Sequence, residues 1–214
     1  MDTAINTFRR IIIVSYRLPF RIQSDGDKKV LVQNSGGLVS AMSALTEKLS
    51  TNKEHPLSEK IMWIGCGENT EAEYLEASGS SSDYHLIPVN IDEQTNKFFY
   101  GGFSNDFLWP LFHYFTNYAV FNEIYFDAYC KAQRLFLEKI EACATEHDFI
   151  WIHDYQLLLL PGMIREKMPA ATIGFFLHTP FPSFETFRMM NRPWREALLN
   201  GMLGADLIGF HIND

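Results

Sequence analysis

The stretch that decides the fold is FIWIHDYQLLLLPGMIREKMPAATIGFFLHTPFP, which runs from residue 149 to residue 182. A short apolar run at 149–152 is followed by a helix-like segment at 157–167 and by a second apolar run at 172–177. Two strands joined by one helix run parallel, because a crossover of that length returns the chain to the same end of the sheet. The pattern therefore predicts a parallel strand–helix–strand unit.

Polar residues follow both predicted strands at the point where each strand ends. His153 and Asp154 come directly after the first apolar run, and His178 follows the second. Open α/β sheets bind ligands outside the carboxyl ends of their strands, so we expect these three residues to meet at a ligand site. Asp154 is the strongest single candidate, because a carboxylate accepts hydrogen bonds from several hydroxyls. The alternative for each histidine is a structural, hydrogen-bonded role.

Strand and helix patterns alternate along the rest of the chain. Further strands are expected at residues 11–15, 61–64, 86–89 and 206–210, a hairpin at 20–23 and 29–33 across an Asp-Gly turn signal, and helices at 38–49 and 121–144. Parallel strands alternating with helices predict a doubly wound α/β sheet that is covered on both faces. A chain of 214 residues is long enough for one large core.

Composition excludes several classes of protein. A net charge of −8 with no basic block argues against a nucleic-acid partner, whose phosphates require clustered cations. The sequence contains three cysteines, Cys66, Cys130 and Cys143, and their spacing gives neither a C-x-x-C pair nor a zinc-binding pattern. This favours reduced thiols in a cytoplasmic protein. The apolar runs are too short to span a bilayer, and the first ten residues lack a secretory signal. No metal-binding pattern is present.

Three further groups could contact a ligand. Arg17 follows the first strand by two residues and suits a phosphate or carboxylate, although a surface salt bridge would also explain it. Gly36-Gly37 opens a helix where backbone N–H groups can approach an anion or a sugar, although a glycine pair is more often a turn. Aromatic residues interleaved with glycine at 100–105, and Trp109 after them, form an irregular segment that could stack on sugars or pack onto the core.

Several short motifs occur in the order found in one enzyme family. They are SYRLP at 15–19, GGL at 36–38, FSN at 103–105, LWP at 108–110, HDY at 153–155, IGFFLHTPFP at 173–182 and GADLIGFH at 204–211. Together they resemble the trehalose-6-phosphate synthase family, over nearly the whole chain. That family transfers glucose from UDP-glucose to glucose 6-phosphate, with retention and without a metal or other cofactor. Its GT-B fold has two Rossmann-like domains, and residues 1–214 resemble the N-terminal, acceptor-side one.

The resemblance implies roles for the acceptor side of the site. Arg17 would contact the 6-phosphate of the acceptor, and Tyr100 and Trp109 would line the acceptor pocket. Asp154 would bind sugar hydroxyls at the junction of donor and acceptor. Asp154 and His178 would be the catalytic residues.

The resemblance also implies roles toward the donor. Gly37 would bring its backbone amide near the diphosphate of UDP-glucose, and His178 would hold the donor glucose. The partners implied are therefore these two small molecules, with neither nucleic acid nor membrane, and with a homo-oligomer left open. No carboxylate is placed as a covalent nucleophile.

The sequence departs from the family at positions near this site. Cys66 stands where the family has tryptophan, Tyr16 where asparagine is usual, and Gln156 where a histidine is usual. Restoring tryptophan at position 66 is expected to be tolerated if nothing else has filled the space. Two alternatives follow: a related glycosyltransferase with another sugar-phosphate or polyol-phosphate acceptor, and a non-catalytic regulatory domain that binds a sugar phosphate.

The family's remaining donor-binding groups lie in a C-terminal domain. A basic pair for the diphosphate and an acidic loop for the ribose are expected beyond residue 214, in a protein roughly twice as long. One half of a cleft cannot close around the donor and exclude water. Residues 1–214 alone are therefore expected to be catalytically inactive.

Overall fold

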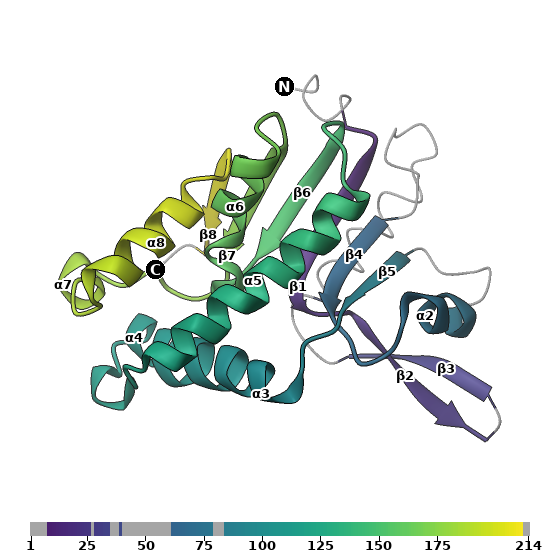
Figure 1. The fold of residues 1–214 in the computed structure, drawn as a ribbon, viewed down its shortest axis with the longest axis horizontal. Helices are drawn as coiled ribbons and strands as arrows, with labels where there is room; N and C mark the ends of the chain where they lie inside the picture. The colour runs from purple at the N-terminus through teal and green to yellow at the C-terminus, as the bar shows by residue number, and fades with distance from the viewer. Residues whose placement is uncertain (1–7, 27, 35–38, 40–60, 79–83, 212–214) are drawn as a thin grey trace.

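A computed structural model of the protein describes residues 8–26, 28–34, 39, 61–78 and 84–211 (Figure 1). Its centre is a six-stranded sheet in the order β5-β4-β1-β6-β7-β8, and every neighbouring pair is parallel. This confirms the predicted parallel α/β architecture. The strands are β1 (Arg10–Arg17), β4 (Ile61–Cys66), β5 (Tyr84–Val89), β6 (Asp148–His153), β7 (Thr172–Leu177) and β8 (Leu207–Phe210).

The predicted hairpin is also present. Strands β2 (Phe20–Asp25) and β3 (Lys28–Gln33) pair antiparallel as a separate two-stranded sheet. Gly26, in the turn, has a φ of 61°, a left-handed conformation that glycine adopts without a steric penalty. The hairpin and helix α2 (Glu71–Ser78) lie beyond β4 and β5, at the lower right of Figure 1.

Side chains of the central strands alternate between two cores. Ile12 and Val14 of β1 face a large cluster built with the helices, whereas Ile11 and Ile13 face a smaller cluster that includes Trp63. Residues two apart on a strand share a face, so β1 contributes to both cores at once. The helix predicted at 38–49 lies outside the described residues, apart from Val39.

Helices that follow β5 along the chain cover the larger core. The helical elements are α3 (Glu93–Asn96), η3 (Lys97–Leu108), α4 (Trp109–Phe112), η4 (Thr116–Tyr118), α5 (Glu123–Cys143), η5 (Tyr155–Leu157), α6 (Leu160–Lys167), α7 (Phe184–Phe187) and α8 (Arg192–Met202). Helix α5 confirms the predicted helix at 121–144 and begins where the side chain of Asn122 caps Ile124 N–H. In Figure 1 it runs diagonally in front of β6 and β1.

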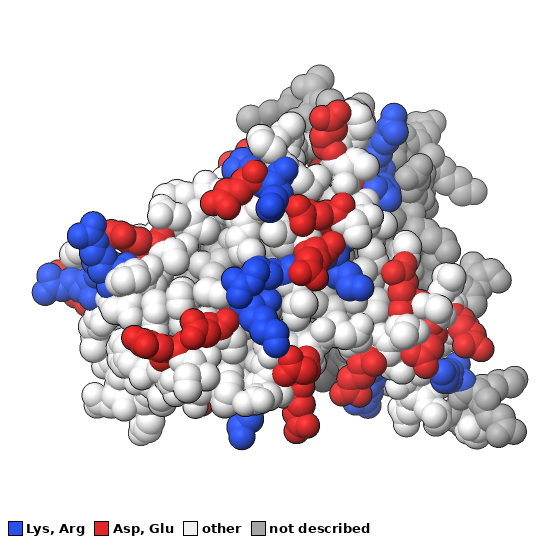
Figure 2. All heavy atoms as spheres, in the orientation of Figure 1, with Lys and Arg blue, Asp and Glu red and all other residues white. Residues whose placement is uncertain are grey.

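The face of the molecule that carries α5 has mixed charge. Figure 2 shows basic and acidic side chains interspersed over it, and ion pairs such as Lys131–Asp92, at 2.9 Å, join side chains of opposite charge.

All three cysteines are free thiols. None of the helices described is long and apolar enough to cross a membrane.

The prediction of an irregular segment at 100–105 was wrong. These residues belong to η3, a π-helix that continues directly into α4. Phe99, Phe103 and Phe107 recur every four residues and are fully buried against the core. The paired glycines at 101 and 102 hide this spacing in the sequence, because glycine is a poor helix former. The burial of three aromatic rings outweighs that local preference.

The two glycines of η3 provide a matched test of this packing. A Cβ atom at Gly102 would lie 2.5 Å from Cγ of Tyr125, whereas one at Gly101 would meet nothing within 4 Å. We expect Gly102→Ala to lower the free energy of unfolding by about 1–3 kcal/mol through overpacking. Gly101→Ala should raise it by about 0.5–1 kcal/mol, because alanine favours the helix. Urea unfolding of both variants measures the difference, and equal effects would contradict the packing described here.

Candidate active site at the carboxyl edge of the sheet

The carboxyl ends of three neighbouring strands bring the predicted site residues to one edge. Arg17 ends β1, His153 ends β6 and is followed by Asp154, and His178 comes directly after β7. Strand β6 pairs with both β1 and β7, so these ends are adjacent. The predicted meeting of His153, Asp154 and His178 is confirmed. Strand β1 is longer than predicted and includes Arg17 itself.

Asp154 connects the ends of β6 and β7. Its N–H donates to the carbonyl oxygen of Phe176 at 2.8 Å, and its Oδ1 accepts from the N–H groups of Tyr155 at 3.0 Å and His178 at 3.2 Å. Its backbone has a φ of 73° and a ψ of 171°, a region otherwise populated almost only by glycine. A strained backbone held by several hydrogen bonds is typical of functional sites.

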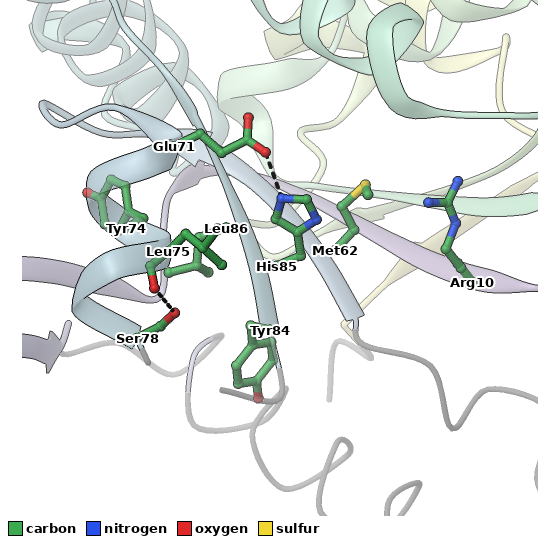
Figure 3. Close-up of a pocket in the computed structure, with 9 residues that line it drawn as sticks. All are labelled: Arg10, Met62, Glu71, Tyr74, Leu75, Ser78, Tyr84, His85 and Leu86. Carbon is green, nitrogen blue, oxygen red and sulfur yellow. Dashed lines mark hydrogen bonds and ion pairs between the residues drawn. The ribbon is translucent and has the colours of Figure 1, made fainter. Parts of the chain in front are cut away.

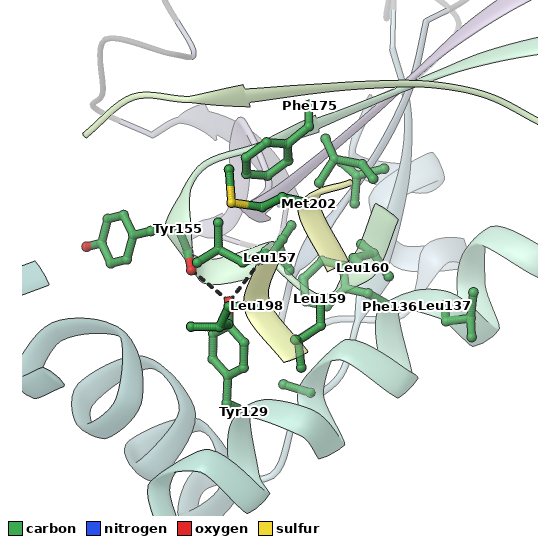
Figure 4. Packing of buried hydrophobic residues seen from close by; sticks show 14 of the residues in the cluster. Tyr129, Phe136, Leu137, Tyr155, Leu157, Leu159, Leu160, Phe175, Leu198 and Met202 are labelled. Atoms are coloured by element: carbon green, nitrogen blue, oxygen red, sulfur yellow. Dashed lines mark hydrogen bonds between the residues drawn. The ribbon is translucent and has the colours of Figure 1, made fainter. Parts of the chain in front are cut away.

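Two buried side chains of α5 hold the turn that follows Asp154. The hydroxyl of Tyr129 donates to the carbonyl oxygen of Tyr155 at 2.8 Å and accepts from Leu158 N–H at 2.9 Å (Figure 4). The amide of Gln133 donates to the carbonyl oxygen of Gln156 at 2.7 Å. Sequence reasoning assigned no role to Tyr129 or Gln133. The available signal was a pair of polar groups, four residues apart, on the otherwise apolar face of a long helix.

Three histidines form a chain across the edge. His153 Nδ1 lies 3.1 Å from His178 Nε2, and His178 Nδ1 lies 3.4 Å from His211 Nε2. Burial and the neighbouring His178 lower the pKa of His153 to about 3, and burial and His211 lower the pKa of His178 to about 4. Both imidazoles are therefore neutral at neutral pH.

Burial also shifts the ionisation of the carboxylate. It raises the pKa of Asp154, and the N–H groups of Tyr155 and His178, with the nearby His211 and His113, offset part of that rise. The site thus places a desolvated carboxyl group beside neutral imidazoles. A carboxyl group in this position can accept hydrogen bonds from a polar ligand.

An aromatic and cationic group lies at the end of β1. The ring of Tyr16 stacks on that of Tyr100 with centroids 4.0 Å apart and planes at 5°. The guanidinium carbon of Arg17 lies 5.7 Å and 5.4 Å from these two ring centroids, and Arg17 Nη2 donates to the Tyr100 hydroxyl at 3.4 Å. Arg17, Tyr100 and Tyr16 therefore form one group, and Tyr16 is one of the positions at which the sequence departs from the family it resembles.

A cavity of about 720 Å³ opens beside this group. Its lining includes four cationic or aromatic residues of the β1–β2 region (Tyr16, Arg17, Phe20 and Arg21) and residues at the end of β4 (Cys66, Gly67 and Glu68). Burial and the nearby Cys66 thiol raise the pKa of Tyr16 to about 12. Tyr16 thus lies close to Cys66 on one wall. Tolerance of tryptophan at position 66 stays a prediction, because Cys66 and Tyr16 both line an open cavity.

Of the predicted site residues that the structure describes, Arg17 lines this cavity, whereas Tyr100, Trp109, Asp154 and His178 do not. Trp109 is 40% exposed on α4 and stacks on His113 with ring centroids 4.3 Å apart. It does not line the 720 Å³ cavity, but His113 is close enough to Asp154 to affect its pKa. Gly37 lies outside the described residues. Among those that are described, no group of three or more histidine, cysteine, aspartate or glutamate side chains is placed to hold a metal ion.

A second cavity, of about 430 Å³, lies between α2 and the starts of β1, β4 and β5 (Figure 3). Met62, Tyr74 and Leu86 supply much of its wall, and His85 Nε2 lies within hydrogen-bonding distance of Glu71 Oε1, at 2.7 Å. It is lined by Arg10 and Tyr84, the first residues of β1 and β5, so it lies at the opposite ends of these strands from the carboxyl edge. It brings together none of the predicted site residues.

The buried histidines should make stability depend on pH. Because their folded-state pKa values lie below the ordinary value of 6.5, the unfolded chain binds protons that the folded chain excludes between about pH 6.5 and pH 4. The free energy of unfolding should therefore fall as the pH is lowered through this window. Urea unfolding at pH 7.5 and pH 5 should show a smaller fall for His153→Gln than for wild type. The exposed His147, changed to glutamine, is the control and should keep the full fall; an unchanged fall in His153→Gln would contradict the assignment.

Comparisons with known proteins agree with the fold and with the family resemblance seen in the sequence. Glycosyltransferase family 20 matches residues 9–214. The "Alpha,alpha-trehalose-phosphate synthase [UDP-forming]" of Emericella nidulans is 41% identical over 210 residues, which is 96% of this chain and 40% of that protein. The chain therefore spans about two fifths of the length of such curated relatives.

Two solved structures share the fold. The N-terminal domain of Candida albicans trehalose-6-phosphate phosphatase is 31% identical with a TM-score of 0.72, covering 99% of this chain and 42% of that one. An E. coli structure bound with UDP-2-fluoro glucose is 26% identical with a TM-score of 0.72, covering 95% of this chain and 40% of that one. With the match over nearly all of its length, the chain belongs to glycosyltransferase family 20.

Proposed function

We propose that this chain is the acceptor-side domain of a UDP-forming trehalose-phosphate synthase, which transfers glucose from UDP-glucose to glucose 6-phosphate. The observation that carries the proposal is the placement of Arg17, Asp154 and His178 at the same sheet edge. It occurs in a chain that is 41% identical to a synthase of that name. UDP and a trehalose phosphate are the products that these two substrates give. We also place the protein in the cytoplasm, where its three free thiols would stay reduced.

Arg17 is the group proposed to bind the phosphate of the acceptor. Its side chain is exposed, and no carboxylate is paired with it within the described part of the chain. A guanidinium donates to a phosphate through two parallel hydrogen bonds, a charge-assisted contact that contributes about 1.5–3 kcal/mol. The cavity next to Arg17 provides room for the rest of the sugar phosphate.

Asp154 and His178 are proposed to hold the reacting sugars. Asp154 Oδ1 already accepts two backbone hydrogen bonds, whereas Oδ2 accepts none from the described residues. Oδ2 is therefore the atom we assign to a sugar hydroxyl. The 3.4 Å contact between His178 and His211 is the longer of the two histidine contacts. A donor hydroxyl could replace it at His178 Nδ1.

Transfer is proposed to proceed with retention. The acceptor hydroxyl would attack the anomeric carbon on the face that the leaving group departs from. The bond from that carbon to the diphosphate oxygen would break, leaving its electron pair on UDP, and the hydroxyl proton would pass to the leaving oxygen. The positive charge that develops on the sugar would be stabilised by the departing phosphate, with Asp154 orienting the hydroxyls. The product named for the relatives, α,α-trehalose phosphate, keeps the α configuration of the donor.

The proposal is tested with the full-length protein that carries this chain. UDP release in the presence of UDP-glucose and glucose 6-phosphate measures transfer, and NMR of the product gives the anomeric configuration. Asp154→Asn should lower kcat by at least about 100-fold, because it removes charge where the transition state develops. The exposed Asp127 on α5, changed to asparagine, is the matched control and should keep wild-type activity. Equal activity in the two variants would contradict the role of Asp154.

A second candidate is a sugar-phosphate-binding domain without transfer. It is favoured by the 31% identity to the N-terminal domain of a trehalose-6-phosphate phosphatase, which covers 99% of this chain. The same assay separates the candidates. Binding of glucose 6-phosphate without any release of UDP would favour this second function.

Residues 1–214 alone should not transfer glucose. The chain spans about two fifths of its relatives, and a cleft formed by one domain cannot surround the donor and exclude water. Purified residues 1–214 should therefore release no more UDP than their own Asp154→Asn variant. Transfer by the short chain above that background would show that the rest of the protein is dispensable.

A further inference from the structure

Tyr16 is held in place from three sides. Its ring stacks on Tyr100 at 4.0 Å and meets the edge of Phe99, with centroids 5.6 Å apart at 69°. Its hydroxyl donates to Asn96 Oδ1 at 2.9 Å. A partly buried phenol with its polar end satisfied and two ring contacts has little rotational freedom. Tyr16 is therefore a rigid element of the cavity wall.

The stack of Tyr16 on Tyr100 joins two different elements of the fold. Tyr16 and Arg17 are neighbours on β1, whereas Tyr100 lies on η3. Arg17 reaches over both rings and donates to the Tyr100 hydroxyl. A long exposed arginine loses much rotamer freedom when it binds an anion, and a contact that orders it beforehand reduces that loss. The stacked rings provide such a contact.

No other residue described on this wall can supply the same surface. Cys66 pairs with Arg17 in the β1–β4 register and carries only a small thiol. Trp109 does not line the cavity. The aromatic residues at the wall are Tyr16, Phe20 and Tyr74, and only Tyr16 is in contact with both Arg17 and Tyr100. Arg17 contacts both stacked rings, and Tyr16 is the one of the two that also lines the cavity, so the placement of Arg17 depends on the stack that Tyr16 forms with Tyr100.

We propose that Tyr16 is a positioning residue that makes the cavity selective for a phosphorylated sugar. It holds Tyr100 and Arg17 so that the guanidinium is ordered before the phosphate arrives. This inference rests on the proposed function in so far as the acceptor is glucose 6-phosphate. Its consequence is that losing the Tyr16 ring weakens binding of the phosphorylated sugar more than binding of the free sugar.

The test measures the affinity of the full-length protein for glucose 6-phosphate and for glucose by calorimetry, together with the KM for UDP-glucose. Tyr16→Asn should weaken glucose 6-phosphate binding about three- to tenfold, the range expected for a lost aromatic and cation–π contact. Glucose affinity and the KM for UDP-glucose should stay within about twofold. Tyr16→Phe keeps the stack and should restore phosphate selectivity. Tyr118→Asn is the matched control, since Tyr118 is 75% exposed and outside the cavity lining.

The results decide whether Tyr16 positions Arg17 for the phosphate or has only a structural role. Equal weakening of both sugars in Tyr16→Asn, or failure of Tyr16→Phe to restore selectivity, would reduce Tyr16 to a structural role and overturn the inference. A wild-type protein that binds no glucose 6-phosphate would overturn it as well. A wild-type protein that binds glucose 6-phosphate in a Tyr16-dependent way, yet releases no UDP, would support the inference and refute the synthase function.

Discussion

The backbone of Asp154 is held in a left-handed, extended conformation, and the rest of the site is arranged around that constraint. A non-glycine residue with a φ of 73° and a ψ of 171° costs about 1–3 kcal/mol, so surrounding contacts must impose it. Three hydrogen bonds do so locally, to Phe176, Tyr155 and His178. They also turn one carboxylate oxygen toward the protein and leave the other for a ligand.

Support for this turn comes from far along the chain. Tyr129 and Gln133 of α5 bind the carbonyl groups that follow Asp154, and α5 in turn packs on η3 through Phe103 and Tyr129, with ring centroids 4.7 Å apart. Helix η3 carries Tyr100 toward Arg17 and Tyr16. The carboxylate end and the arginine end of the site are therefore positioned by the same two helices. A loss of packing between α5 and η3 would disturb both.

Much of this arrangement was predictable because it follows from strand order. An apolar run followed at once by a polar residue places that residue at the carboxyl edge, so Arg17, Asp154 and His178 could be located without a structure. Contacts across elements could not be located in this way. The stack of Tyr16 on Tyr100 joins residues 84 positions apart, and no local pattern encodes such a pair. The helical state of residues 97–108 was missed because the glycines at 101 and 102 have low helix propensity, while the burial of Phe99, Phe103 and Phe107 decides the conformation.

The measurement that tests this account most directly compares the stabilities of Asp154→Gly and Asp154→Ala. Both changes remove the same carboxylate and the same two hydrogen bonds, and they differ in whether a Cβ atom remains at the strained position. If the backbone is constrained as described, urea unfolding should find the glycine variant more stable than the alanine variant by about 1–3 kcal/mol. At an unstrained position alanine is the more stable of the two by about 0.5–1 kcal/mol. That order, or equal stability, would contradict the constraint at Asp154.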